Sequence, residues 1–147
     1  MTELNQYSFT VRIRISHPSI DPDEITRGLG MKPTACGQAG QRRKTPNGTL
    51  LDSCWRESYW CADPLDRGDY SIGNALIEDS MTEVLGVLDP KKEFLLKMRG
   101  EGARIRASVG AFGGSTFGFE LSPDLLGKFS AIGVGFVFES FPCRQQW

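Results

Sequence analysis

Residues 7 to 16 read Tyr-Ser-Phe-Thr-Val-Arg-Ile-Arg-Ile-Ser, and this stretch decides the fold. Aromatic and aliphatic side chains occupy the odd positions, from Tyr7 to Ile15, and polar side chains occupy the even positions, from Ser8 to Ser16. Because successive side chains of a strand point to opposite faces, the alternation predicts a strand with one buried face and one polar face. The proline that follows His17 marks its end.

Four helices are predicted beyond this strand from their capping residues and the helical spacing of their apolar residues. They run from Asp21-Pro22 to Gly30, from about Ile72 to Leu88, from Asp89-Pro90 to Gly100, and from Ser122-Pro123 to Gly133. Aspartate or serine before proline suits the cap and first helical position, and glycine suits the end of a helix.

Further strands are predicted from alternation at Leu50 to Trp60, Ala103 to Val109, Phe117 to Leu121, and Val134 to Phe138. Gly113-Gly114 is expected to form a two-residue hairpin turn between two of them. Residues 34–50 are expected to form a long loop, and residues 142–147 an irregular tail. The sequence therefore predicts one α+β domain over residues 1–147, with a largely antiparallel (mixed) sheet of about five strands and helices packed on one face.

The charge balance bears on the partners of the protein. The 147 residues include 17 Lys and Arg against 18 Asp and Glu, a formal net charge of -1. Such a surface has no overall field to attract a nucleic-acid backbone or an anionic membrane, so we expect neither partner. The first residues have no secretory signal pattern, and no apolar run approaches the roughly 18 residues of a membrane span. We therefore expect a cytoplasmic protein with reduced thiols.

The residue types that carry metal or acid–base chemistry are sparse. The chain has one histidine, His17, and four cysteines, Cys36, Cys54, Cys61 and Cys143. Their spacing lacks the close cysteine pairs that hold zinc, and no motif promotes a thiol to a nucleophile. The three aspartates Asp63, Asp66 and Asp69 have the spacing of turn residues rather than of a calcium loop. We expect no catalytic residue, no metal and no cofactor.

Trp55, Arg56, Tyr59 and Trp60 are candidate contact residues for a protein partner, because Trp, Tyr and Arg anchor protein interfaces. They follow a basic run from Gln41 to Lys44, and a basic run beside stacking rings also fits a single-stranded RNA binder. A small-molecule binder or enzyme, with a pocket between the sheet and the 34–50 loop, is the other alternative.

Strand phasing predicts a second candidate surface on the sheet face opposite the core. This face is expected to carry the arginines Arg12, Arg14, Arg104 and Arg106, together with Ser8, Thr10, Glu120 and Glu139. The arginines and glutamates can pair across strands. Alternatively, the guanidinium groups can hold an acidic partner or ligand in a bidentate manner.

Several landmarks of the chain come in a characteristic order. After the alternating opening strand come Asp21-Pro22-Asp23-Glu24-Ile25-Thr26, Leu29-Gly30-Met31-Lys32-Pro33-Thr34, a loop with Gly40 that leads to Trp55 and Ser58, Leu88-Asp89-Pro90, Leu121-Ser122-Pro123-Asp124-Leu125-Leu126, and Ile132-Gly133-Val134. The order resembles the small bacterial family called domain of unknown function 4279, over nearly the whole chain. Because these landmarks are caps, turns and core positions, the resemblance implies a fold and no catalytic residue.

The leading interpretation is a non-enzymatic protein-interaction module, and an immunity or antitoxin-like protein is its most concrete form. It follows from a single domain with balanced charge and no catalytic constellation, in which Trp, Tyr and Arg gather beside a loop.

Overall fold

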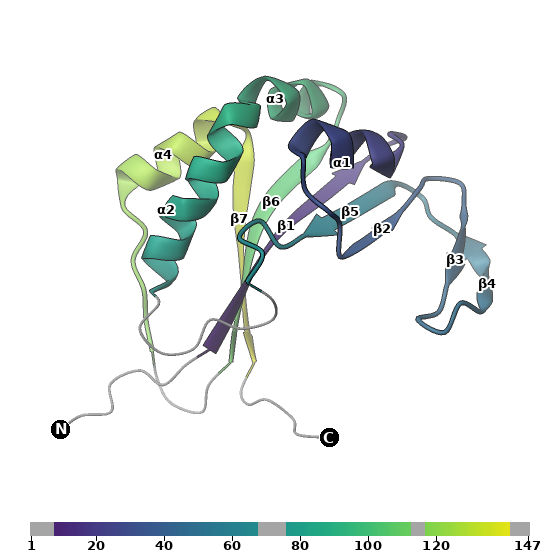
Figure 1. Ribbon diagram of the computed structural model, residues 1–147, viewed down its shortest axis with the longest axis horizontal. Helices are drawn as coiled ribbons and strands as arrows, with labels where there is room; N and C mark the ends of the chain where they lie inside the picture. The colour runs from purple at the N-terminus through teal and green to yellow at the C-terminus, as the bar shows by residue number, and fades with distance from the viewer. Residues whose placement is uncertain (1–7, 68–75, 113–116, 142–147) are drawn as a thin grey trace.

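The computed structural model describes residues 8–67, 76–112 and 117–141 (Figure 1). In chain order its elements are β1 (Ser8–His17), α1 (Pro22–Leu29), β2 (Ala35–Gly37), β3 (Arg42–Lys44), β4 (Leu50–Cys54), β5 (Ser58–Ala62), α2 (Ile77–Leu88), the 3-10 turn η1 (Asp89–Lys91), α3 (Lys92–Gly100), β6 (Arg104–Phe112), α4 (Pro123–Ala131) and β7 (Val134–Phe141).

Five of the strands form one mixed sheet in the order β2-β5-β1-β6-β7. β1 lies at its centre and pairs antiparallel with β5 and β6, and β2 pairs antiparallel with β5. β7 pairs parallel with β6. The remaining strands, β3 and β4, form a separate two-stranded sheet. The predicted α+β class and the mixed five-stranded sheet are confirmed.

The alternation in β1 produces the two faces that it predicts. Phe9, Val11, Ile13 and Ile15 are buried in the core. The helices cover this side of the sheet (Figure 1). Opposite the core lies the open face, whose side chains come from Arg12, Arg14 and Ser16 of β1, Tyr59 and Cys61 of β5, Arg104, Arg106 and Ser108 of β6, and Glu139 of β7.

The predicted capping residues hold the ends of the helices. The Asp21 side chain accepts a hydrogen bond from the Asp23 amide at 2.9 Å, and Gly30 ends α1 with a left-handed φ of 67°. The Ser122 hydroxyl accepts from the Leu125 amide at the start of α4. The first part of the helix predicted from Ile72 lies outside the described residues, and the helix is observed from Ile77.

The segment expected to be a loop contains structure. Within residues 34–50, β2 adds an edge strand to the main sheet and β3 pairs with β4. The strand predicted from Leu50 to Trp60 is likewise two strands in different sheets, because the chain turns at residues 55–57. β2, β3 and β4 are short and largely exposed. The burial pattern that reveals β1 therefore does not extend to them.

The prediction of a strand from Phe117 to Leu121 is wrong. Residues 117–122 have no regular structure, and the chain then forms α4 before returning as β7, parallel to β6. The alternating phenylalanines have another cause. Phe117 contacts Phe138, and Phe119 contacts both Phe136 and Phe138. The Gly113-Gly114 turn and the tail at residues 142–147 lie outside the described residues.

Candidate functional site

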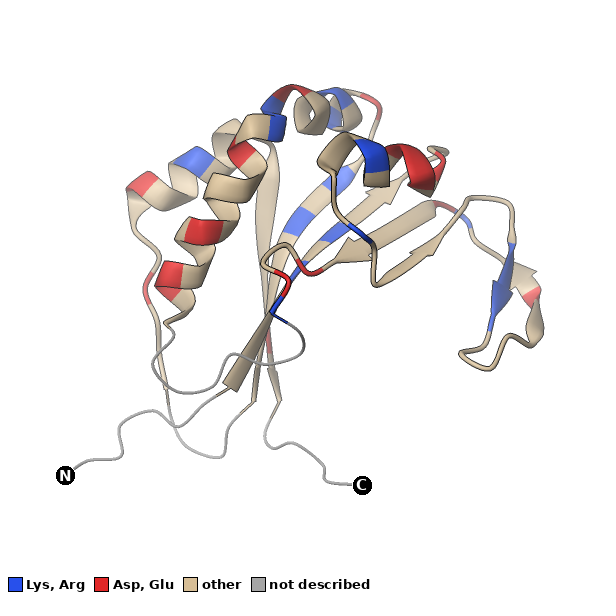
Figure 2. Ribbon diagram, viewed as in Figure 1, with Lys and Arg blue, Asp and Glu red and all other residues tan. Residues whose placement is uncertain are grey.

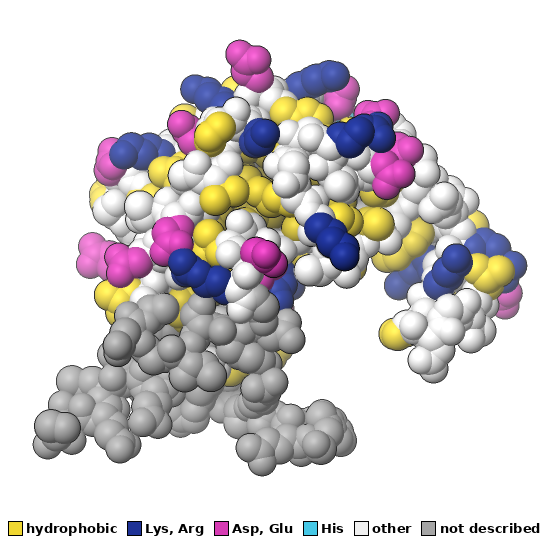
Figure 3. Space-filling view, in the orientation of Figure 1, with side chains coloured by type: hydrophobic (Ala, Val, Ile, Leu, Met, Phe, Trp, Pro, Cys, Tyr) yellow, Lys and Arg dark blue, Asp and Glu magenta, His cyan; other side chains and the backbone are white. Residues whose placement is uncertain are grey.

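β3, β4 and the residues that connect them, Arg42–Cys54, form a protruding hairpin that we call the ribbon. All residues of both strands are exposed, and Leu50 and Leu51 retain 48% and 37% of their accessible surface. The ribbon stands out from the body of the molecule, with apolar and basic side chains on it (Figure 3). A two-stranded ribbon with no buried face gains little stability from its own residues.

Trp55 joins the ribbon to the open face. Its amide donates to the Gln41 carbonyl at 2.8 Å, and its ring stacks on Tyr59 with centroids 6.0 Å apart and planes 13° apart. The Arg43 guanidinium lies 5.0 Å from the centroid of the indole ring. The indole lies so close to Gly37 that a Cβ atom there would be 2.5 Å from the ring. The absence of a side chain at Gly37 therefore makes room for this contact.

The four predicted arginines lie on the open face, two on β1 and two on the adjacent β6. Blue bands are visible on both strands (Figure 2). Three of the four arginines are paired with carboxylates. Arg12 lies 3.6 Å from Asp63, Arg14 lies 2.8 Å from Glu139, and Arg104 lies 3.5 Å from Glu57. The Arg14 and Glu139 side chains are 34% and 40% exposed, so solvent screens their attraction.

Arg106 differs from the other three arginines. Among the described residues no carboxylate lies within 4.0 Å of its guanidinium. One hydrogen bond from Nη2 reaches the Ser16 hydroxyl at 3.4 Å, and Nε is buried with no partner. Arg106 also stands directly opposite Arg14 across the β1–β6 ladder. Because Arg14 is paired with Glu139 and Arg106 has no carboxylate partner among the described residues, Arg106 gives the open face an uncompensated positive charge.

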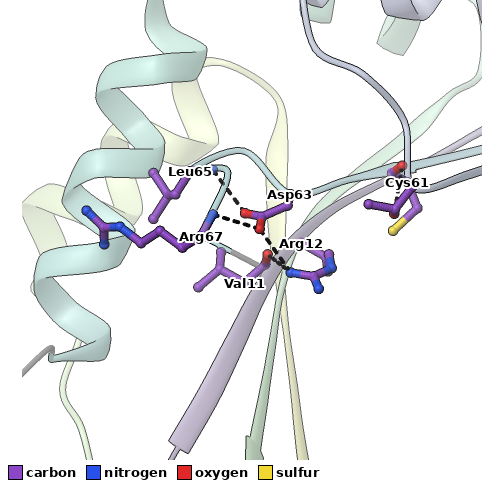
Figure 4. Close-up of polar contacts among 7 residues, drawn as sticks. Val11, Arg12, Cys61, Asp63, Leu65 and Arg67 are labelled. Atoms are coloured by element: carbon purple, nitrogen blue, oxygen red, sulfur yellow. Dashed lines mark hydrogen bonds and ion pairs between the residues drawn. The ribbon is translucent and has the colours of Figure 1, made fainter. Parts of the chain in front are cut away.

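The Asp63 carboxylate fixes the turn that follows β5. Because Asp63 directly follows the last residue of β5, its carboxylate also contacts Arg12 at the edge of the open face. Oδ1 accepts from the Leu65 amide at 3.1 Å, and Oδ2 accepts from the Arg67 amide at 3.0 Å and faces Arg12 (Figure 4). Asp63 is thus a turn residue, as its spacing predicts, with the added role of an ion-pair partner. Asp69 lies outside the described residues.

Tyr59 lies beside the arginines on the same face. Burial raises the pKa of its hydroxyl above the ordinary value, and the contact with Cys61 raises it further, whereas Arg14 and Arg106 act in the opposite direction. The hydroxyl therefore stays protonated at neutral pH and can donate a hydrogen bond.

The predicted contact residues divide into two groups. Trp55 stacks on Tyr59, whose hydroxyl is influenced by Arg14 and Arg106, and Arg56 is exposed at the turn between the sheets. Trp60 is a correction. Its side chain is 0% exposed and its indole N–H donates to the Thr26 hydroxyl at 3.0 Å, so it belongs to the core. Alternation explains the difference, because Tyr59 and Trp60 are neighbours in β5 and point to opposite faces.

Glu120 is a second correction. It was expected on the open face as part of a return strand, but it lies in the irregular segment before α4. Its amide donates to the Glu78 carboxylate in the first turn of α2 at 3.0 Å. Of the two glutamates expected on the open face, Glu139 is there and pairs with Arg14.

His17 has its polar atoms committed to the fold. Nδ1 accepts hydrogen bonds from the Ser19 and Ile20 amides at 3.0 and 2.9 Å, which leaves Nε2 to carry the proton and donate to Glu101 at 3.1 Å. The side chain is 6% exposed. The imidazole fixes the turn after β1, and neither nitrogen is left to take a proton from a substrate.

A groove of about 360 Å³ lies on the helix side of the sheet, between α4 and the start of β7. Its lining is mainly apolar, with Leu126, Phe129 and Phe136 beside the single charged residue Arg99. None of its lining residues belongs to the 34–50 segment, where the alternative interpretation places a pocket.

The described residues contain no group of three or more His, Cys, Asp or Glu side chains placed to hold a metal ion. Cys36 and Cys54 are exposed free cysteines, and Cys61 is buried. None of the described helices has the length and apolar character that crossing a membrane requires.

Comparison with known protein families shows to which family the chain is related. A family model described as domain of unknown function (DUF4279) matches residues 5–140. The chain belongs to the DUF4279 family. The resemblance drawn from the landmarks of the sequence is therefore confirmed, and the family assigns no activity. No curated protein and no solved structure matches the chain.

The ribbon and its exposed leucines were not predicted from the sequence. A signal was present, because Asn47-Gly48 separates the basic residues of β3 from β4 and an Asn-Gly pair is a strong hairpin signal. Gly48 has a φ of 85°, and the Thr45 amide donates to the Thr49 carbonyl to close the turn.

Proposed function

We propose that this protein is a non-enzymatic protein-interaction module that uses the ribbon and the adjoining open face to bind a partner with acidic and apolar side chains. The exposed ribbon is the observation that carries the proposal. It presents Leu50 and Leu51 to solvent, and it is joined to the sheet through the Trp55 ring and a few backbone hydrogen bonds.

The chemistry of the surface supports a protein partner over single-stranded RNA. The stack of Arg43 on Trp55 suits either partner. Exposed leucines give a nucleic-acid backbone nothing to bind, whereas they bury well in a protein interface with an aromatic and arginine anchor. The unpaired edges of a two-stranded ribbon also offer backbone groups to a partner strand.

An immunity or antitoxin-like role is the more specific form of the proposal. A single recognition surface on one domain suits a one-to-one complex in which a partner protein is bound and blocked. We place this role in the cytoplasm, where exposed thiols such as Cys36 and Cys54 stay reduced.

The test compares capture of a partner by three forms of the protein. Wild type, the double variant Leu50→Gln/Leu51→Gln, and the control Leu96→Gln are each used as bait in lysate of the cells that make the protein. Leu96 is 41% exposed, but it lies on α3, on the helix side of the sheet. We expect wild type and the Leu96 variant to capture one protein in stoichiometric yield, and the ribbon variant to lose about tenfold or more of it.

Thermal unfolding shows whether the three baits are equally folded. Equal capture by the ribbon variant would contradict the proposed surface, and failure of folded wild type to capture any protein would contradict the interaction itself.

A further inference from the structure

The arginines of the open face show which ligand this surface accepts. Arg12, Arg14 and Arg104 each lie between 2.8 and 3.6 Å from a carboxylate of the chain itself. Carboxylates are thus the counter-ions of the arginines on this face, and a guanidinium group suits them because its planar fork of donors matches a carboxylate. Arg106 has the same chemistry and, among the described residues, no such partner.

The position of Arg106 makes the absence of a partner for it energetically unfavourable. Its Nε is buried without a hydrogen-bond partner, and an unmet buried donor destabilises the fold. Its register partner is Arg14, whose own charge is paired with Glu139 at 2.8 Å, so this neighbour does not compensate the charge of Arg106. Arg106 as a whole is only partly buried, so an anion on the open face could contact the accessible part of its guanidinium and compensate its positive charge.

The neighbours of Arg106 supply further donors and, from β7, no side chain that could cover it. Gly135 is its register partner on β7, and a Cβ atom there would be in ordinary contact with Arg106 Cγ at 3.9 Å. The Ser16 hydroxyl already contacts the guanidinium, and the Tyr59 hydroxyl lies within electrostatic reach of both Arg14 and Arg106.

We propose that Arg106, with Arg14, Ser16 and Tyr59 around it, forms a binding site for a carboxylate. In the complex proposed above the carboxylate is an Asp or Glu side chain, or the C-terminus, of the partner; for this identity alone the inference rests on the proposed function. The ribbon then contacts the apolar part of the partner while Arg106 holds its acidic group.

The test follows the Nε–Hε signals of the arginines by NMR while sodium glutarate is added to the whole protein. Sodium chloride at matched ionic strength and sodium phosphate are titrated separately. We expect the Arg106 signal to shift and saturate with glutarate and not with chloride. Glutarate should also bind more tightly than phosphate, because the fork of donors matches a planar carboxylate.

Two variants decide which side chain is responsible, with the Arg14 Nε signal as the reporter. Arg106→Gln should weaken glutarate binding by about tenfold or more. Arg104→Gln, which removes a 64% exposed arginine of the same strand, should leave binding unchanged. Without anion the Arg106 variant should melt at the wild-type temperature or above, because a buried donor without a partner is removed.

Several outcomes would overturn the site: an equal response to chloride, tighter binding of phosphate, or a response that survives Arg106→Gln. Glutarate binding without capture of a protein would leave the site in place and contradict the proposed function. If this protein captures a partner but binds no glutarate, the proposed function stands and the carboxylate site is contradicted.

Discussion

The strand β1 and the ribbon lie in one chain but are stabilised in different ways. In β1, four apolar side chains are buried at 0 to 6% exposure, and antiparallel neighbours pair with it on both sides. In the ribbon, every strand residue is exposed and each strand has a single neighbour. The comparison shows that the body folds through burial, whereas the ribbon is held out from it at little gain in stability.

This difference assigns stability to the body of the protein and recognition to the ribbon. A region that contributes little to the core can change its surface without unfolding the protein, which suits recognition. Trp55 lies at the boundary, since its ring packs on Gly37 and Tyr59 of the main sheet while its backbone continues the ribbon.

The largest effect should separate two tryptophans only five positions apart. Trp60→Ala removes a fully buried ring and its hydrogen bond to Thr26, so it should lower the free energy of unfolding by about 3–5 kcal/mol. Trp55→Ala removes a partly exposed ring and should lower it by about 1 kcal/mol or less. Urea unfolding followed by circular dichroism measures both.

If Trp60→Ala does not fold, Trp60→Phe replaces it and should still destabilise the protein more than Trp55→Phe. Equal losses at the two positions would remove the distinction between body and ribbon.

A smaller effect is expected at the end of β1, where a polar side chain supports the body. His17→Ala leaves the Ser19 and Ile20 amides without their acceptor, and should lower the free energy of unfolding by about 1–3 kcal/mol. Glu101→Gln keeps an oxygen that can accept from Nε2, so its effect should stay within about 0.5 kcal/mol.

The pair of variants also tests the role given to His17. Should Glu101→Gln destabilise the protein as much as His17→Ala, the hydrogen bond from Nε2 to Glu101 and not the turn would be the important contact.

The same comparison explains what the sequence could predict of the fold. β1, α1, α4 and β7 follow from alternation and caps, because burial on one face leaves a period in the sequence. β2 and β3 have no buried face and so leave no such period. Phe117 and Phe119 show the converse case, in which a period of two is present without a strand. Their side chains contact those of β7, and their backbone pairs with no neighbouring strand.

The candidate site was predictable in part. Phasing correctly places Arg12, Arg14, Arg104 and Arg106 on one face, because period two fixes which side chains share a side. Which arginine lacks a carboxylate depends on Glu57, Asp63 and Glu139, and their positions follow from strand order and turns that one sequence does not specify.

Hydrogen exchange of the backbone amides tests the central claim, a packed body and a ribbon free to engage a partner, most directly. The amides of Ile13 and Ile15 should exchange only through global unfolding, whereas those that pair β3 with β4 should exchange through local opening at a much lower free energy. Protection of the ribbon amides equal to that of β1 would contradict the account, because the ribbon would then fold and unfold as part of the core.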